Sequence, residues 1–169
     1  MVTVSEKFEE VLMNTRNKQV TKASLLTLER YLPYRLSILS NRVSTLVAES
    51  YKGRFGLSIT QWRIMAVLGE YPGASADEIS AKTQIEKSLI SRAISNLLNR
   101  NLIQRQISRE DKRRTQIDLT ETGYDVYSQI VPLSLEYEDQ ILSCLSTDEQ
   151  EQLSQLIDRL YDNAEKLQF

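Results

Sequence analysis

Residues 75–119, with the sequence SADEISAKTQIEKSLISRAISNLLNRNLIQRQISREDKRRTQIDL, decide the fold of this chain. Ser75 stands where it would cap a short helix over residues 76–82, and the spacing of apolar residues predicts a second helix from about residue 86 to residue 99. Residues 83–85 leave only a tight turn between the two helices. Two short helices joined by so short a turn are typical of a helix-turn-helix.

A β-hairpin is expected directly after the second helix. Residues 103–107 and 115–119 each alternate apolar and polar side chains, which is the period of a strand. Residues 108–114, SREDKRR, lie between them as a charged tip whose Arg and Lys side chains would extend beyond the strands. A helix-turn-helix followed by such a hairpin is a winged helix. In that architecture the second helix occupies the major groove of DNA, and the tip reaches phosphates or the adjacent minor groove.

Charge is strongly segregated along the chain. The 169 residues carry a net charge of -2, yet residues 82–114 hold nine basic and three acidic side chains, a net charge of +6. Residues 118–169 hold twelve carboxylates and two cations. A basic island in an acidic chain indicates a surface for a polyanion. Charge alone would fit a solvated face equally well, so the arrangement of the side chains has to decide.

The polar half of the expected second helix has an unusual composition. On a helical wheel the apolar residues fill one half, and the other half carries small hydroxyls, amides and Arg92. A merely solvated helix would normally carry Glu and Lys there, and exposed serines are mediocre helix formers. Short polar side chains let a helix approach a groove, Ser and Asn can bond to phosphates or base edges, and Arg can bind guanine in bidentate fashion.

These observations predict a set of DNA-binding residues on the second helix and on the wing tip. They are Lys87, Ser88, Ser91, Arg92, Ser95, Asn96, Arg109, Asp111, Lys112, Arg113 and Arg114. Within the tip, we expect Asp111 to hold one neighbouring arginine while the other arginine meets DNA. The alternative is a surface ion pair worth under about 1 kcal/mol.

The composition argues against an enzyme. The chain has no His, which removes the commonest general base and the commonest zinc ligand, and it has a single Cys. It contains no Gly-rich phosphate loop and no nucleophile-elbow motif. We therefore predict no catalytic residues, no metal site and no cofactor. Cys144 lies among leucines without a neighbouring cation, so we expect it to be a buried small apolar residue rather than a redox switch.

The sequence also argues against a membrane protein. Its longest uninterrupted apolar run is residues 64–68, far short of the roughly 20 residues that cross a bilayer. The first ten residues are rich in charge and do not form an apolar signal core. We expect a cytoplasmic protein that has no membrane partner.

Helices are expected before the helix-turn-helix. Residues 5–19 are amphipathic, and residues 24–51 repeat apolar side chains every three or four positions, with Pro33 bending or dividing the helix. Gly53 and Gly56 would end that helix. A further short helix is expected to begin at Ser58 or Thr60 and to stop at the sequence Tyr-Pro-Gly that begins at residue 71.

Two long helices are expected after the wing. Thr120 would cap a helix to about residue 143, bent or interrupted at Pro132, and the motif Thr147-x-x-Gln150 is typical of a capping box that opens a last helix to Lys166. These helices carry more apolar side chains than a helix outside a core needs. We therefore expect them to pack against the N-terminal helices and against a second copy of the chain, which makes the protein a homodimer.

The winged region resembles the MarR family of transcription regulators. The resemblance covers about residues 58–123. Its matching motifs are Gln61-Trp62, Lys87-Ser88-x-x-Ser91-Arg92, Asn101-Leu102-Ile103, Asp111-x-Arg113-Arg114 and Leu119-Thr120-x-x-Gly123. The resemblance implies an obligate homodimer whose two winged helices read a pseudo-palindromic site. It also implies release from DNA when a small, often aromatic or phenolic, molecule binds between the dimerisation helices and the winged domain.

The expected fold class is mainly α with a small β-hairpin wing, a winged helix-turn-helix domain joined to a helical dimerisation domain. We assign residues 1–57 to an N-terminal arm and the first dimerisation helices, residues 58–122 to the DNA-binding domain, and residues 123–169 to the C-terminal dimerisation helices.

The effector site implied by the resemblance would lie where the apolar stripe of residues 32–47 faces Trp62 and Met65. Arg35 and Arg42 are seven residues apart on one edge of that stripe, so either could neutralise a carboxylate ligand. The alternative reading is that the arginines extend over the core and that Trp62 and Met65 belong to the core.

Two functions stay open at this point. The first is a ligand-responsive, sequence-specific DNA-binding dimer, most simply a repressor that blocks polymerase by occupancy. The second is a winged-helix module that binds another protein instead of a specific DNA site. The affinity for duplex DNA should fall steeply with salt in the first case, and little duplex binding is expected in the second.

Overall fold

A computed structural model describes residues 26–107 and 115–167 of the chain. The chain divides into two compact units between Ser40 and Asn41. The elements in chain order are α2 (Leu32–Phe55), α3 (Ile59–Glu70), α4 (Ala76–Thr83), α5 (Lys87–Asn99), β1 (Ile103–Ile107), β2 (Thr115–Leu119), α6 (Glu121–Leu142) and α7 (Thr147–Lys166). The fold is mainly α with one two-stranded antiparallel hairpin, as predicted.

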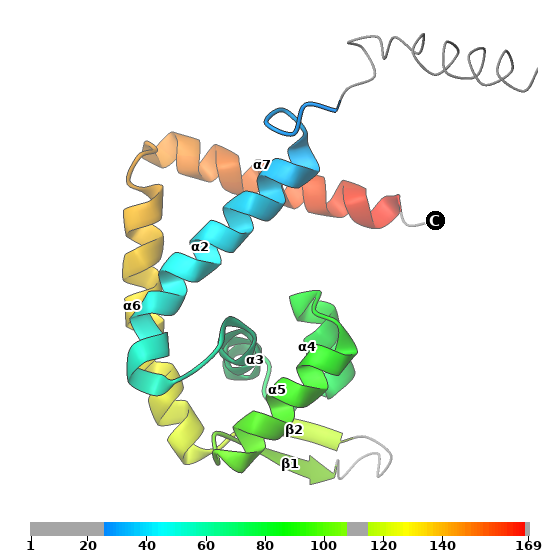
Figure 1. Ribbon diagram of the computed structural model, residues 1–169, viewed down its shortest axis with the longest axis vertical. Coiled ribbons are helices and arrows are strands. Elements are labelled where there is room, and N and C mark those ends of the chain that lie inside the picture. Colours follow the sequence, from blue (N-terminus) through cyan, green and yellow to red (C-terminus); the bar gives the residue numbers. More distant parts are fainter. Residues whose placement is uncertain (1–25, 108–114, 168–169) are drawn as a thin grey trace, which may run out of the picture. The chain divides into compact units, whose positions relative to one another are not determined.

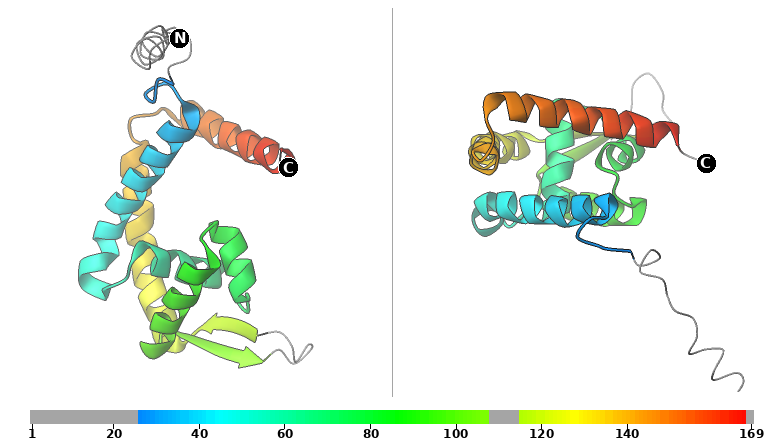
Figure 2. Two further views of the ribbon diagram at one scale, coloured as in Figure 1. Left: turned by 45° about the vertical axis from the view of Figure 1, so that its right-hand side comes forward. Right: turned by 90° about the horizontal axis from the view of Figure 1, so that it is seen from above.

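The helix-turn-helix forms where the sequence predicts it. Ser75 caps α4 in a reciprocal box, accepting from the backbone N–H of Glu78 while the Glu78 side chain accepts from the Ser75 backbone. Gln84 ends α4 in the left-handed region with φ 53°, which turns the chain toward α5. In Figures 1 and 2, α4 and α5 lie beside each other next to α3, and the hairpin extends from this cluster.

The backbone segment before α4 helps to fix the hairpin to the helices. Its strands pair from Ile103 opposite Leu119 to Ile107 opposite Thr115. Ala74, just before α4, forms an isolated antiparallel bridge with Ile117, and the Ile117 backbone N–H donates to the Ala74 carbonyl at 3.1 Å. The wing therefore starts from a fixed position relative to the helix-turn-helix.

The core of this part of the chain comes from the end of α2, from α3, α4 and α5, from the hairpin and from α6. Each helix contributes the apolar side of its surface, as a helix in a small globular domain does. The fully buried side chains include Ile64, Met65, Leu68, Ile79, Ile90, Ile94, Leu97, Ile103, Ile117 and Ile130. This core holds the polar face of α5 in place from behind.

Helix α2 differs from the expected helix over residues 24–51. It begins at Leu32, after a turn in which the Tyr31 backbone N–H donates to the Thr27 carbonyl at 3.0 Å. Pro33 explains the start, since proline has no N–H and fits the first turn of a helix but not its interior. The helix ends at Phe55, and Gly56 follows with φ 59°, whereas Gly53 stays inside it.

Helix α6 starts at a close contact that only glycine permits. Thr120 caps α6 by accepting from the Gly123 backbone N–H, as predicted, and the Thr120 backbone N–H donates to the Leu102 carbonyl at 3.2 Å. A Cβ at residue 123 would overlap the Leu102 carbonyl oxygen. The helix continues through Pro132 to Leu142, so of the two expected alternatives, a bend or an interruption, the interruption is excluded.

Helix α7 is capped one residue earlier than predicted. Ser146, not Thr147, accepts from the Glu149 backbone N–H, and the Glu149 carboxylate accepts in return from the Ser146 backbone. Gln150 instead donates to the Leu142 and Leu145 carbonyls, each at 3.2 Å. Ser146 precedes the helix in extended backbone, where a cap must stand, and this geometry decides between two adjacent hydroxyl residues.

Two expected features lie outside the described residues. These are the amphipathic segment at residues 5–19 and the wing tip at residues 108–114. None of the helices within 26–107 and 115–167 has the length and apolar character that a membrane span requires.

Candidate nucleic-acid interface

The polar half of α5 is exposed along its whole length. The predicted residues Lys87, Ser88, Ser91, Arg92, Ser95 and Asn96 are all exposed, and so is Asn99. The opposite side packs into the core through Ile90, Ile94 and Leu97. The predicted apolar half is wrong at one position, because Leu89 stands at the edge of the wheel and is exposed. A flat polar surface of short side chains, backed by a rigid core, is what α5 presents to solvent.

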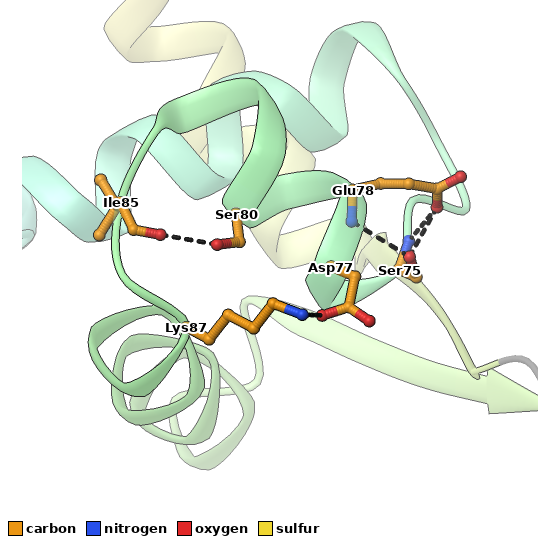
Figure 3. A network of polar contacts seen from close by, with 6 residues as sticks. All are labelled: Ser75, Asp77, Glu78, Ser80, Ile85 and Lys87. Carbon is orange, nitrogen blue, oxygen red and sulfur yellow. Dashed lines mark hydrogen bonds and ion pairs between the residues drawn. The ribbon is translucent and has the colours of Figure 1, made fainter. Parts of the chain in front are cut away.

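A network of polar contacts fixes the turn between α4 and α5 (Figure 3). The Ser80 hydroxyl donates to the Ile85 carbonyl at 2.7 Å, which closes the turn. Lys87 Nζ lies 2.7 Å from an Asp77 carboxylate oxygen, so the first residue of α5 is paired with the first turn of α4. Both charged side chains are exposed, and this pair contributes orientation more than stability.

Three side chains on the polar face of α5 make local bonds that align them with the helix. The Ser88 hydroxyl donates to the Glu86 carboxylate at 2.7 Å, and the Ser95 hydroxyl donates to the Ser91 carbonyl at 2.9 Å. Arg92 Nε makes a long bond of 3.4 Å to the Ser88 carbonyl. These bonds use one donor of each side chain. The hydroxyl oxygens can still accept, and the terminal nitrogens of Arg92 can still donate.

The N-terminus of α5 carries no side-chain cap. Glu86 occupies the N-cap position, but its side chain makes no capping bond, whereas α3, α4, α6 and α7 are each capped by a Ser or Thr hydroxyl. The backbone N–H groups of Lys87 and Ser88 are therefore left for another acceptor, whereas those of Leu89 and Ile90 donate to the Glu86 carbonyl at 3.0 and 3.1 Å. Such N–H groups together with the helix dipole favour a phosphate.

The basic side chains near α5 fall into two groups. Arg100 donates to the Phe55 carbonyl at 2.5 Å and to the Gly56 carbonyl at 3.1 Å, and Lys82 Nζ lies 3.4 Å from the centre of the Tyr71 ring. These two cations serve the protein's own packing. Arg92 and Arg105 are exposed, and within residues 26–107 and 115–167 neither has a carboxylate partner.

The structure also shows a contact that the sequence analysis did not assign. Gln61, on α3, is only 8% exposed, and its Nε2 donates to Asn96 Oδ1 at 2.6 Å. The motif Ser58-x-x-Gln61 has the pattern of a capping box and could have drawn attention to Gln61 as a fixed side chain. Its partner on α5 comes from the tertiary packing of α3 and could not be read from the spacing.

The predicted wing residues Arg109, Asp111, Lys112, Arg113 and Arg114 lie outside the described residues. The strands on either side of them show where the tip begins, since Ile107 and Thr115 are the last paired residues of the hairpin. The pairing of Asp111 with an arginine stays a prediction.

The residues predicted to hold an effector differ in their burial. Met65 is fully buried in the core. Trp62 is half-buried between Tyr51 and Tyr127, with ring centroids 5.6 Å and 5.9 Å away, and Tyr127 lies 6.1 Å from Tyr124. Burial raises the pKa of Tyr51, and the nearby Arg63 opposes that rise. This row of rings joins α2, α3 and α6.

Arg35 and Arg42 are both exposed on α2, but Arg35 belongs to the N-terminal unit and Arg42 to the other. Arg42 borders a shallow hollow with Asn41, Thr45 and Leu46. A larger hollow of about 500 Å³ lies between α2 and the start of α3. Its lining is Thr45, Ala48, Glu49, Lys52, Leu57, Ser58, Ile59 and Thr60.

Two further expectations concern metals and Cys144. Among the described residues, no group of three or more metal-ligating side chains is arranged around a common point. Cys144 is exposed, so the expectation of a buried residue is wrong. Helix α6 ends at Leu142, which leaves Cys144 in the turn before α7 rather than on a helix face.

A helix-turn-helix with an exposed polar second helix and an adjoining hairpin defines a winged helix-turn-helix protein. Residues 55–114 match the sequence model of the MarR family. This match covers the winged region, where the sequence itself resembles the same family.

Known relatives agree with this assignment. The HTH-type transcriptional regulator BilQ from Clostridium symbiosum is 28% identical over 116 residues, which are 69% of this chain and 81% of that protein. A MarR/EmrR family transcriptional regulator from Acinetobacter sp. ADP1 has a crystal structure that matches with a TM-score of 0.77 and 27% identity, over 84% of this chain and all of that chain. Both relatives are transcriptional regulators.

A third protein shares the fold at lower identity. BpsR from Bordetella bronchiseptica matches with a TM-score of 0.72 and 17% identity, over 82% of this chain and 98% of that chain. DNA binding by BpsR is regulated by 6-hydroxynicotinic acid. At this identity the likeness concerns the fold alone.

Proposed function

We propose that this protein binds a specific, pseudo-palindromic DNA site as a homodimer and leaves it when a small molecule, for example an aromatic one, binds. The observation that carries the proposal is the exposed face of α5, where hydroxyls, amides and Arg92, which has no carboxylate partner among the described residues, stand on a helix whose other side is locked in the core. The simplest action of such a dimer is repression by occupying the site.

In the proposed complex, α5 enters the major groove. Arg92, near the start of the helix, grips a guanine through its free terminal nitrogens, and Ser88 and Ser91 reach base edges or phosphates. The uncapped first turn of α5 and Lys87 bind a phosphate. Arg109, Lys112, Arg113 and Arg114 of the wing tip bind the backbone or the minor groove beside it, and Asp111 orients one of them.

The apolar face of α7 supports the dimer. Leu153, Leu156, Ile157, Leu160 and Tyr161 are all exposed, and the helix buries no residue. A helix with so continuous an apolar stripe needs a partner surface. A second copy of the chain supplies one with the same stripe. A two-fold axis would then place the two α5 helices about 34 Å apart, one turn of DNA.

The proposed roles of the segments follow the expected domain boundaries. Residues 58–122 bind DNA, and residues 1–57 and 123–169 form the dimer.

A DNA-binding regulator works where the chromosome is, so we place the protein in the cytoplasm. The protein needs no catalytic residue, metal or cofactor for this function.

The hollow between α2 and α3 is our candidate for the effector site. It combines apolar walls with Glu49, Lys52 and the Ser58 and Thr60 hydroxyls, a mixture suited to a small ring that carries a polar group. It begins beside the α3 cap, whereas the residues first predicted for the effector, Trp62 and Met65, are in packed surroundings. The example of BpsR shows that a protein of this fold can couple DNA binding to such a molecule.

The test measures duplex affinity as a function of salt for the full chain. Genomic fragments selected by the protein supply the specific site, and a random duplex of equal length is the reference. We expect log affinity to fall linearly with log salt, by about 0.9 per phosphate neutralised. Weak binding at every salt concentration would overturn the proposal and would indicate a protein-interaction module.

Two substitutions separate the roles of the helix and the wing. Arg92→Ala should lower affinity for the specific site by about tenfold or more and leave random DNA less affected, since a bidentate base contact is worth about 1–3 kcal/mol of discrimination. Arg113→Ala should weaken both duplexes alike and reduce the salt slope by about 1. Arg159→Ala, on α7, is the matched control and should change neither the affinity for the two duplexes nor the salt slope. Equal losses on both duplexes for Arg92→Ala would contradict its role in base recognition.

A further inference from the structure

We propose that Gln61 is a positioning residue that holds the Asn96 side chain so that its amide nitrogen, and not its oxygen, faces the DNA. Asn96 would then donate to a phosphate oxygen. This inference rests on the proposed DNA-binding function, and it assigns to α3 a part in an interface that is otherwise formed by α5 and the wing.

The orientation of the Gln61 amide is set by the cap of α3. The Ser58 backbone N–H donates to Gln61 Oε1 at 2.8 Å, and the Gln61 backbone N–H donates to the Ser58 hydroxyl at 3.2 Å. A backbone N–H can only donate, so the Gln61 atom facing it must be the oxygen. The other end of the amide, Nε2, is then directed away from the cap.

The orientation of Asn96 follows from that of Gln61. Gln61 Nε2 can only donate, and its partner at 2.6 Å is Asn96 Oδ1. Turning either amide over would place two donors against each other and leave a nearly buried polar group of Gln61 unsatisfied. The backbone on either side of Asn96 is anchored by Ile94 and Leu97, both fully buried. The α3 backbone therefore fixes which way the Gln61 amide points, and Gln61 in turn fixes which atom of the Asn96 amide faces the surface of α5.

The outward group of Asn96 is an amide donor at an exposed position. Asn96 lies in the third turn of α5, beyond the N-terminal residues with which a recognition helix contacts base edges. In the proposed complex, a side chain at this position meets the sugar-phosphate backbone, and phosphate oxygens only accept hydrogen bonds. A fixed donor fits a phosphate, and no reorientation is needed when DNA binds.

The substitution Gln61→Glu reverses the polarity and keeps the cap. Glutamate serves at the same position of the capping boxes of α4 and α7, so it can accept from Ser58 in the same way. A carboxylate has no donor for Asn96. The Asn96 amide should therefore turn over, donate to the carboxylate and present its oxygen to the phosphate.

A double-mutant cycle on duplex affinity tests this chain of contacts. Gln61→Glu should weaken binding about tenfold in the wild-type background, because a hydrogen bond to a charged phosphate is lost. In the Asn96→Ala background the same change should weaken binding only about twofold, the part due to its added charge. Losses of equal size in both backgrounds would overturn the inference, as would an Asn96→Ala protein that binds like the wild type.

A nuclear magnetic resonance measurement on the DNA-free protein tests the orientation directly. The wild type should show scalar coupling across the hydrogen bond from Gln61 Nε2 to the Asn96 side-chain carbonyl carbon. Gln61→Glu should show coupling from Asn96 Nδ2 to the carboxylate carbon at position 61. Wild-type coupling in the opposite sense would overturn the inference even if the protein binds DNA. Failure of the wild type to bind any duplex would overturn the proposed function, and this role of Asn96 with it.

Discussion

Helices α5 and α7 have the same kind of sequence and opposite surroundings. Both carry a continuous apolar stripe opposite a polar one. In α5 the stripe is buried, with Ile90, Ile94 and Leu97 at most 1% exposed. In α7 the corresponding side chains stand open, with Leu156 51%, Ile157 53% and Leu160 46% exposed.

The difference teaches that the period of a sequence identifies the apolar face of a helix but not its partner. The face of α5 is covered by α3, α4 and the hairpin, which come from the same chain. Among the described residues, none that belongs to α7 is buried. Helix α5 is therefore complete in one chain, whereas the proposed dimer would supply the partner surface of α7.

The largest expected effect separates the two helices by stability. Ile94→Ala removes a fully buried side chain and should lower the free energy of unfolding by about 2–5 kcal/mol. Ile157→Ala makes the same chemical change on α7 and should cost under about 0.5 kcal/mol when the protein is dilute enough to be monomeric. Urea unfolding monitored at low concentration measures both. Similar losses for the two variants would mean that α7 is buried within its own chain.

The next prediction concerns the assembly itself. Ile157→Asp places a charge on the open face of α7 and should raise the dissociation constant of the dimer by about thirtyfold or more, since a central interface residue is worth about 2 kcal/mol. Sedimentation velocity over a range of concentrations measures it. Asp158→Asn, at the neighbouring position, is the control. A dimer that is unchanged by Ile157→Asp would place the interface elsewhere.

The smallest effects are expected at the helix caps. Ser75→Ala should lower the stability of the winged region by about 1 kcal/mol, and Ser146→Ala should lower only the helix content of α7 in the monomer. Thermal unfolding and circular dichroism distinguish the two. A cooperative loss of stability in monomeric Ser146→Ala would contradict the independence of α7.

The cap of α7 also makes its stability depend on pH. The Ser146 backbone N–H, and then its hydroxyl, donate to the Glu149 carboxylate and hold the Glu149 pKa below its usual range. A pKa that is lowered in the folded state stabilises the helix above the ordinary glutamate range, and that contribution is lost as the pH falls through the lowered value. When the monomeric protein is acidified, circular dichroism should show that part of the helix content of α7 is lost. The Glu149→Gln variant should lose less helix content over the same pH range.

Much of the fold could be predicted because its signals are local. The Ser75 cap, the turn before α5, the two strands and the Thr120 cap each depend on residues within a few positions of one another, and all are present. Local signals also explain the errors. Pro33 places the start of α2 at Leu32, later than predicted. Ser146 and Thr147 are adjacent hydroxyl residues that could each cap α7, and the sequence pattern alone did not decide between them.

The candidate site was predictable only in part. The exposed face of α5 follows from the wheel, but Leu89 shows that a residue at its edge can be placed only from the packing. Gln61 could not be connected to Asn96, because 35 residues separate them along the chain. The exposure of Cys144 depended on where α6 ends, and helix ends are the least certain part of a sequence-based prediction.

The two bonds of Arg100 have a mechanical consequence. This side chain follows the last residue of α5 and donates hydrogen bonds to the carbonyls of Phe55 and Gly56, where α2 ends. Because the Arg100 guanidinium bonds both carbonyls, a rotation or shift of the last turn of α2 would move the C-terminal end of α5 with it. A small molecule that displaces this end of α2 would therefore also shift α5, the helix proposed to face DNA.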